Sequence, residues 1–200
     1  MSNNPIPTTQ PDIALKGLID AIDFAAIKHS KQKRKDLDGT PYINHPIGVV
    51  KNLADAGVYD IATLQAAALH DTVEDTNTTF DELEKKFGKE VAYIVEECTD
   101  DEALPRWERK RLQIVTTPNK SDKAKLVKLA DKLYNLNDIT RQVPVDCSKQ
   151  RVIEYFEWAK KVTDGAKGVN VLLDNKLENF YKEAKASLNG ETFKCHPLIE

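Results

Sequence analysis

The sequence predicts an all-α fold, a compact orthogonal helical bundle. Apolar residues return at three- and four-residue steps along most of the chain, which is the period of a helix with one buried face. No segment shows the apolar–polar alternation of a strand bounded by hairpin turns. The 200 residues, 40% hydrophobic and 30% charged, suffice for one domain with its own core. We therefore expect a single domain of about eight to ten helices.

Both ends of the chain are expected to lie outside this bundle. Residues 1–11 contain three prolines and otherwise mostly polar residues, which is typical of a flexible N-terminal tail. Residues 189–200 are interpreted as a second, C-terminal tail. The domain is therefore predicted over residues 12–188.

The first three helices follow from cap residues and apolar faces. A helix is predicted after Asp12, a favourable N-cap. Its apolar face carries Leu15, Leu18, Ile19, Ile22, Ala25 and Ala26. A second, short helix should begin at Pro46, which suits a first turn, and stop at Gly57, which suits a left-handed C-cap. Asp60 caps a third helix, from Ile61 to about Val73, which is apolar nearly all round and is expected in the middle of the domain.

The remaining helices are marked in the same way. Thr79 and Glu82 have the spacing of a capping box, and Gly88 should end the short helix that follows. The next two helices carry Val91, Ile94, Val95 and Cys98, and then Trp107 and Leu112. Ser121 caps a longer helix with the apolar stripe Leu126, Leu129, Leu133 and Leu136. The last two helices carry Val152, Tyr155, Phe156, Ala159 and Val162, and then Leu173, Leu177, Phe180, Tyr181 and Ala184.

Composition argues against several classes of function. Lys and Arg total 29 against 32 Asp and Glu, so the net charge of −3 provides no positive field for nucleic acid. No apolar stretch approaches the ~20 residues of a membrane-spanning helix, and the N-terminal residues do not resemble a secretory signal. The chain has three cysteines, Cys98, Cys147 and Cys195, and they share no CxxC spacing. An odd number without this spacing argues against a disulfide framework and against a zinc-finger module. We expect a cytoplasmic protein without a nucleic-acid or membrane partner.

Ionisable residues gather abruptly where the apolar third helix ends. His70 and Asp71 are adjacent there, and Glu74 and Asp75 follow each of them at i+4, so the four polar groups line one wall. Burial of unpaired charge is costly, and a metal cation would compensate it. A hydrogen bond between His70 and Asp71 at the helix end explains the pair alone equally well.

Two other segments can complete a metal site. His45 stands at the mouth of the second helix, and Asp131 lies opposite the leucine stripe with Asn135 one turn further on the same face. Two imidazoles and two carboxylates from three helices can form an N2O2 site that leaves positions for water. These ligand types suit manganese, iron, cobalt or zinc alike.

At this point the sequence resembles a known family. The order of His45, His70-Asp71 and Asp131 is that of the HD metal-dependent phosphohydrolase superfamily. The segments at 34–35, 39–46, 68–76 and 128–136 closely resemble the hydrolase domain of RelA/SpoT alarmone enzymes. The resemblance runs from about residue 15 to about residue 185 and is strongest to the stand-alone animal type, the metazoan SpoT homologues, which are small alarmone hydrolases. It implies a bundle of the HD-domain type.

The resemblance also implies residue roles. His45, His70, Asp71 and Asp131 match the ligands of one manganese ion per site, and Glu74 and Asp75 match the pair that handles the attacking water. Asn135 matches the substrate-contacting asparagine of the family, and Arg34 and Lys35 lie in the matching stretch and are candidates for binding phosphate. Arg151 and Tyr155, one helical turn apart, are further candidates for binding phosphate and stacking, although Tyr155 suits the core equally well. Lys28, Lys31 and Lys33 are interpreted as a solvated helix end.

Three functions are compatible with these residues. The resemblance implies manganese-dependent hydrolysis of the 3′-pyrophosphate of ppGpp and pppGpp, which yields GDP or GTP and pyrophosphate. A second possibility is removal of the 2′-phosphate of NADPH, or of a phosphate from another nucleotide, at the same metal centre. A third is a helical binding module without turnover, against which the water-handling carboxylates argue. The expected partner is a small nucleotide, and the oligomeric state is left open.

Overall fold

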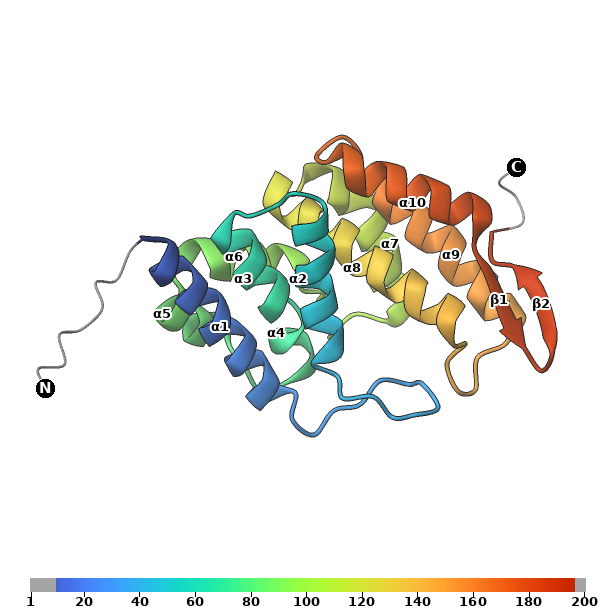
Figure 1. Cartoon of the computed structure of the whole chain (residues 1–200), viewed down its shortest axis with the longest axis horizontal. Helices are drawn as coiled ribbons and strands as arrows, with labels where there is room; N and C mark the ends of the chain where they lie inside the picture. The colour runs from blue at the N-terminus through green and yellow to red at the C-terminus, as the bar shows by residue number, and fades with distance from the viewer. Residues whose placement is uncertain (1–9, 197–200) are drawn as a thin grey trace, which may run out of the picture.

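A computed structural model describes residues 10–196, and it confirms the predicted all-α class (Figure 1). The helices are α1 Gln10–Lys28, α2 Asn44–Asp55, α3 Ile61–Leu69, α4 Thr72–Asp75, α5 Phe80–Phe87, α6 Lys89–Cys98, α7 Arg106–Thr116, α8 Asp122–Arg141, α9 Lys149–Asp164 and α10 Val171–Glu183. A 3₁₀ turn, η1 (Thr117–Asn119), precedes α8, and a β-hairpin, β1 (Lys185–Leu188) and β2 (Glu191–Lys194), follows α10. The tail predictions for 1–9 and 197–200 lie outside the described residues.

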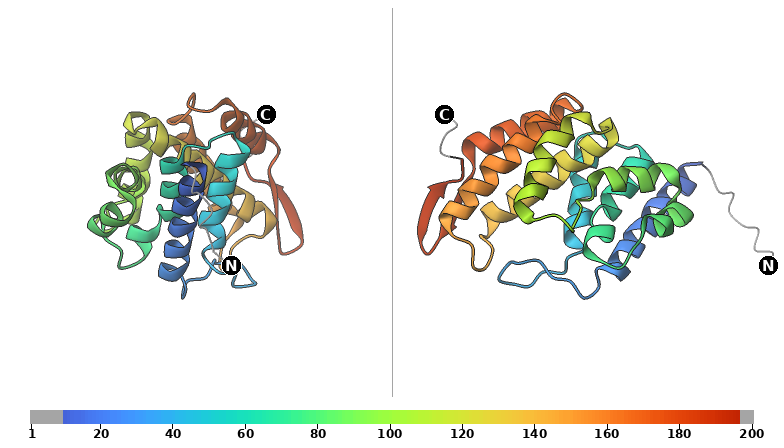
Figure 2. Two further views of the ribbon diagram at one scale, coloured as in Figure 1. Left: turned by 60° about the vertical axis from the view of Figure 1, so that its left-hand side comes forward. Right: turned by 180° about the vertical axis from the view of Figure 1, so that it is seen from behind.

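Helices α3 and α8 form the centre of the bundle. Helix α3 contacts α1, α2 and α6, and α8 contacts α2, α3, α6, α9 and α10. Seven of the nine residues of α3 are buried, which confirms the predicted central position of this helix. Figure 2 shows α1 and the hairpin at opposite ends of the molecule, with α8 passing between them. Within residues 10–196, no helix is both long enough and apolar enough to cross a bilayer.

Local cap chemistry sets several helix starts where the sequence predicts them. The side chain of Asp60 accepts from the Thr63 amide at 2.9 Å, and Ser121 accepts from the Ala124 amide at 3.2 Å. The third predicted helix, however, is interrupted. Helix α3 ends at Leu69, and Asp71 adopts φ −95° and ψ −4° before α4 begins. His70 and Asp71 nevertheless keep right-handed helical dihedral angles, and the Asp75 amide donates to the Asp71 carbonyl at 2.9 Å, so the i+4 spacing of Asp71 and Asp75 persists.

The buried face of α1 agrees only in part with the predicted one. Ala25 is buried and Leu18 and Ile22 pack against the core as predicted, but Leu15 and Ile19 are 58% and 56% exposed. The reason is that α1 packs against α3, where Gln65 donates its side-chain amide to the Gly17 carbonyl at 2.9 Å. Helix α1 also begins at Gln10, so Asp12 is not its N-cap and residues 10–11 are not part of a tail.

The interpretation of residues 189–200 as a tail is wrong for its described part. Strands β1 and β2 pair antiparallel, with Ala186 opposite Phe193 on the buried side. The turn is formed by Asn189 and Gly190, with φ of 52° and 82°. Asn-Gly is the preferred pair for a two-residue hairpin turn, because both residues tolerate positive φ. The strands are only four residues long, so their alternation is too short to reveal them.

Gly48 allows a close approach that positions the site. A Cβ at Gly48 would lie 1.8 Å from Cε2 of Tyr134, whose ring packs 5.0 Å from that of His45. We expect Gly48→Ala to destabilise the protein by about 1–3 kcal/mol through overpacking, measured by denaturant unfolding. Gly17→Ala is the matched control within another helix, because its Cβ would meet only the flexible Gln65 amide at 3.0 Å. A Gly48→Ala protein as stable as the parent would contradict the expectation.

Candidate functional site

Two adjoining hollows hold the residues that the sequence singles out. A cavity of about 150 Å³ is lined by His45, His70, Asp71, Glu74 and Asp131 among others. A larger cleft of about 740 Å³ lies beside it, within the usual size range of ligand pockets. The smaller hollow is called the metal cavity here, because it contains the predicted metal ligands. Arg34, Tyr42 and Asn135 line both hollows, so these three residues mark the junction between the metal cavity and the cleft.

The structure brings the four predicted metal ligands together. His45 lies in the first turn of α2, His70 and Asp71 at the break between α3 and α4, and Asp131 in α8. Nε2 of His45 is 3.3 Å from Asp71 Oδ2 and also 3.3 Å from Asp131 Oδ1. One potential ligand atom each from His45, His70 and Asp131 lies within 4.8 Å of the others. Asp71 completes the group, because its Oδ1 is 3.2 Å from His70 Nε2.

The protonation of His70 fits a metal ion at this position. Its Nδ1 donates to the Ala67 carbonyl at 2.8 Å, so in the neutral ring Nε2 carries a lone pair. This Nε2 is buried and has no hydrogen-bond partner among the described residues, although the Asp71 carboxylate is close. A lone pair facing a carboxylate is unfavourable unless a cation lies between them. The donor set of imidazole nitrogens and carboxylate oxygens therefore fits a divalent transition metal.

The raised pKa of His45 also indicates that the cluster favours a bound cation. Burial alone would lower the pKa of His45, but hydrogen bonds to Asp131 and Asp71 outweigh it and raise the pKa to about 9. The same two carboxylates have pKa values below their ordinary range, because the neighbouring histidines and Lys132 outweigh the cost of burial. The cluster therefore binds positive charge, which a metal ion can supply in place of a proton.

Three further side chains hold the carboxylate ligands, and the sequence assigned this role to none of them. The Tyr42 hydroxyl donates to Asp71 Oδ2 at 2.8 Å, and its ring packs 4.8 Å from that of His29. Lys132 Nζ lies 2.8 Å from Asp131 Oδ2, and Asn135 donates to Asp131 Oδ1 at 2.6 Å. The neighbours of a ligand normally fix its orientation in this way. Tyr42 and Lys132 stand inside the quoted motif segments, but only the fold shows which carboxylate each contacts.

The two candidate water-handling residues occupy different positions. Glu74 lines the metal cavity, and its Oε2 accepts from the Asp100 amide at 3.1 Å. Burial, with the nearby charges of Asp100 and Asp71, raises the pKa of Glu74 to about 7. Burial and the charge of Asp71 also raise the pKa of Asp75, although this residue is not among the described residues that line the cavity. Glu74 is therefore the better placed of the two.

All five predicted substrate contacts line the cleft: Arg34, Lys35, Asn135, Arg151 and Tyr155. Arg34 is held in place, because its Nη2 donates to Asn135 Oδ1 at 2.8 Å and to Asp138 Oδ2 at 2.9 Å. Lys35 is exposed. Tyr155 packs against the core and also borders the cleft. Its position is therefore compatible both with a core role and with contact to the substrate.

The cleft contains cations that the sequence could not place. Lys33 lines it and is exposed, as the interpretation of a solvated residue requires, although it lies in the loop after α1 and not at the helix end. Arg106 and Lys110 of α7 also line it, and Lys110 Nζ lies 4.5 Å from the centre of the Trp158 ring. Lys132 Nζ lies 4.9 Å from the centre of the same ring. The ring of Trp158 therefore contacts one lysine of the cleft, Lys110, and one lysine of the metal cavity, Lys132.

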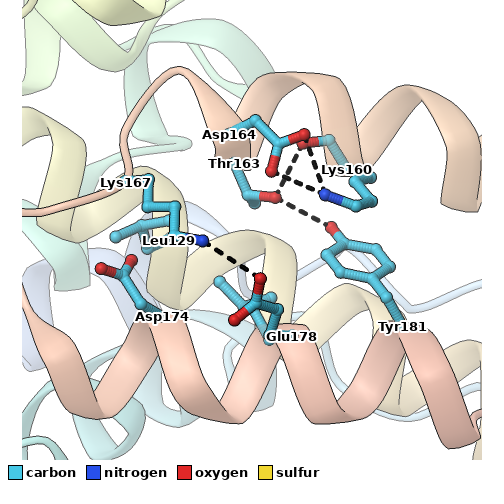
Figure 3. Close-up of a pocket in the computed structure, with 9 residues that line it drawn as sticks. Leu129, Lys160, Thr163, Asp164, Lys167, Asp174, Glu178 and Tyr181 are labelled. Atoms are coloured by element: carbon cyan, nitrogen blue, oxygen red, sulfur yellow. Dashed lines mark hydrogen bonds and ion pairs between the residues drawn. The ribbon is translucent and has the colours of Figure 1, made fainter.

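A smaller cavity, between α9 and α10, has no comparable features (Figure 3). Its volume is about 20 Å³. Lys160 pairs with Asp164 at 2.7 Å and Lys167 with Glu178 at 3.1 Å, and the hydroxyls of Thr163 and Tyr181 lie 3.1 Å apart. These polar groups satisfy one another, so the cavity is part of the packing of the two helices.

Comparisons with known proteins agree with this geometry. A family model described as HD domain matches residues 21–155. The human protein "Guanosine-3′,5′-bis(diphosphate) 3′-pyrophosphohydrolase MESH1" is 58% identical over 167 residues, which cover 83% of this chain and 93% of that protein. The protein of the same name from Xenopus tropicalis is 56% identical over the same shares.

A solved structure is also similar along nearly the whole chain. It is described as a metazoan orthologue of SpoT that hydrolyses ppGpp and plays a role in starvation responses. The TM-score is 0.81 at 42% identity, and the match covers 89% of this chain and 97% of the other. With the family model and the two MESH1 relatives, this match places the chain in the HD domain family and, within it, in the group of the MESH1 proteins.

Proposed function

We propose that this protein is a metal-dependent guanosine-3′,5′-bis(diphosphate) 3′-pyrophosphohydrolase that converts ppGpp or pppGpp to GDP or GTP and pyrophosphate. The observation that carries the proposal is the cluster of two histidines and two aspartates beside Glu74, at the end of a cleft rich in cations. The names of relatives that are 56% and 58% identical support the substrate.

The four clustered residues His45, His70, Asp71 and Asp131 would hold one divalent ion, for which we propose manganese. When bound, such an ion polarises a phosphoryl group and lowers the pKa of water. Tyr42, Lys132 and Asn135 keep the two carboxylates in position through the hydrogen bonds described above. The protein thus supplies a pre-arranged set of ligands.

Glu74 is the proposed proton acceptor for the attacking water. Hydrolysis forms a bond between water oxygen and phosphorus and breaks the bond from phosphorus to the sugar 3′ oxygen. One proton must therefore leave the water, and one must reach the 3′ oxygen. Oε2 of Glu74 already accepts from the Asp100 amide, whereas Oε1 makes only a 3.9 Å ion pair with Arg109, so Oε1 is the atom that takes the proton from water. A pKa of about 7 suits a group that gains and loses a proton near neutral pH.

The cleft is the proposed site of the nucleotide. Its lining includes the seven cations Lys33, Arg34, Lys35, Arg106, Lys110, Arg141 and Arg151, against the four acids Asp36, Asp138, Asp146 and Glu154. This surplus of positive charge complements the 5′-diphosphate of the substrate. Tyr155 provides an aromatic face beside these cations.

Product analysis tests the proposal directly. Purified, manganese-loaded protein is incubated with ppGpp and with NADPH in parallel, and the products are separated by ion-exchange chromatography. We expect GDP and pyrophosphate from ppGpp. Release of orthophosphate from NADPH alone would assign the site to a nucleotide phosphatase instead. Absence of product from both nucleotides would favour a binding module.

Lys35 should affect substrate binding more than turnover. We expect Lys35→Ala to raise the KM for ppGpp about two- to fivefold at low salt, since an exposed charge contributes roughly 0.4–1 kcal/mol. The kcat should change little, and the effect on KM should shrink with added salt. Lys31→Ala is the matched control, because Lys31 is also exposed but lines neither hollow. An unchanged KM in Lys35→Ala would indicate that Lys35 is a solvated surface residue without a role in substrate binding.

A further inference from the structure

Two buried lysines line the metal cavity: Lys132, which holds Asp131 in position, and Lys128, which has no assigned role. Lys128 and Lys132 lie one turn apart on α8, and each is only 5% exposed. Lysine is rarely buried unless it is paired, because its ammonium loses hydration. Both border the cavity that contains His45, His70 and Asp131.

Their present partners use only part of their hydrogen-bonding capacity. Lys128 Nζ donates to the Cys98 carbonyl at 3.1 Å, at the C-terminal end of α6. Lys132 Nζ donates to Asp131 Oδ2 at 2.8 Å. Within residues 10–196 each ammonium has this one acceptor, yet an ammonium carries three N–H donors. Lys128 therefore has two N–H donors that no described acceptor occupies, whereas Lys132 Nζ also lies 4.9 Å from the centre of the Trp158 ring.

The charge of the cavity also favours an anion. The acids in its lining are Asp71, Glu74 and Asp131, and the cations are Arg34, Lys128 and Lys132. With the two histidines neutral, as they are when they bind a metal ion, and with Glu74 ionised, these side chains balance one another. A divalent ion would leave the cavity with a net positive charge, which attracts the phosphate groups of a nucleotide.

The position of Lys128 identifies which phosphate it can reach. Arg34, Tyr42 and Asn135 face both hollows, whereas Cys98, Gln113 and Lys128 line the metal cavity and not the nucleotide cleft. Along α8, Asn135 lies at the junction with the cleft, Asp131 lies one turn before it, and Lys128 lies one turn further from the cleft. A phosphoryl group beside Asp71 and Glu74 would direct the next phosphate along the chain towards Lys128.

We propose that Lys128, assisted by Lys132, forms a binding site for the terminal phosphate of the pyrophosphate that is removed. This inference rests on the proposed function and deepens it. The site selects nucleotides with a 3′-diphosphate over those with a 3′-monophosphate. Nucleotides with a single ester phosphate, such as NADPH, leave it empty.

Equilibrium binding tests the proposal. The Glu74→Gln protein, expected to be inactive, is titrated calorimetrically in the presence of Mn²⁺ with ppGpp and with guanosine 5′-diphosphate 3′-monophosphate. The two nucleotides differ only in the terminal phosphate. We expect the added change Lys128→Met to weaken ppGpp binding about 10- to 100-fold, the usual range for one hydrogen bond to a charged group. Binding of the 3′-monophosphate should change less than about threefold.

Lys120→Met is the matched control. Lys120 Nζ also donates to a carbonyl at the end of α6, that of Glu97, but Lys120 lines the neighbouring cavity around Arg109. Lys120→Met should lower the unfolding temperature as much as Lys128→Met does, but it should leave the preference for ppGpp over the 3′-monophosphate unchanged. Lys128→Gln, which keeps a donor for the Cys98 carbonyl, replaces Lys128→Met if that protein does not fold.

Equal losses for both nucleotides, or the same loss in Lys120→Met, would overturn the assignment of Lys128. Failure of Glu74→Gln itself to bind either nucleotide would instead contradict the proposed function. The two results are therefore distinguishable.

Discussion

Chelation of divalent metal is expected to abolish hydrolysis of ppGpp and to lower the unfolding temperature, and added Mn²⁺ should restore both. Nε2 of His70 faces the Asp71 carboxylate at 3.2 Å and has no hydrogen-bond partner within residues 10–196. A cation there removes this unfavourable contact. Because the ion binds the native state, a hundredfold excess over its dissociation constant should add about 2.7 kcal/mol of stability.

The measurements are product formation and calorimetric unfolding with and without chelator. The His70→Ala protein is the control, since its unfolding temperature should no longer respond to Mn²⁺. Full activity in an exhaustively metal-free sample would contradict the assignment of the cluster as a metal site.

Replacement of Glu74 by Gln should lower kcat by roughly a hundred- to ten-thousandfold, the usual contribution of a general base, and replacement of Asp75 by Asn should lower kcat less, because Asp75 does not line the described cavity. Each change keeps the size of the side chain and removes its ability to accept a proton. In the Glu74→Gln protein the side-chain amide oxygen can still accept from the Asp100 amide, so the fold around it should persist. Both proteins should retain bound manganese, measured by elemental analysis after gel filtration.

Asp71→Ala provides the contrast to these two variants. It should lose the metal together with the activity, because Asp71 touches both histidines of the cluster. If the Glu74→Gln and Asp75→Asn proteins released manganese as readily as Asp71→Ala, the division between ligands and water-handling residues would be wrong.

Much of the fold and of the candidate site follows from local signals. Asp60 and Ser121 cap helices where their chemistry predicts, and the nearly all-apolar segment from Ile61 lies at the centre of the bundle. The spacing of His45, His70 and Asp131 likewise indicated a site formed by three helices, and these residues do lie together.

The features that could not be predicted depend on contacts between distant segments. Tyr42 and Asp71 meet only when the loop before α2 packs against the break after α3, and no local pattern encodes that contact. Lys128 looks like an ordinary helical lysine until the end of α6 covers it. Four-residue strands are equally inconspicuous, although Asn189-Gly190 was a usable signal for their turn.

The origin of the ligands in α2, the α3–α4 break and α8 also constrains the order of folding. The chain from residue 45 to residue 131 must close a long loop before the site exists, and this closure carries an entropic cost. A nascent chain that has not yet docked α8 onto α2 and α3 therefore presents only part of the ligand set. The four ligands come together only in the folded protein. A metal ion can therefore bind all of them, and stabilise the site, only after the helices have packed.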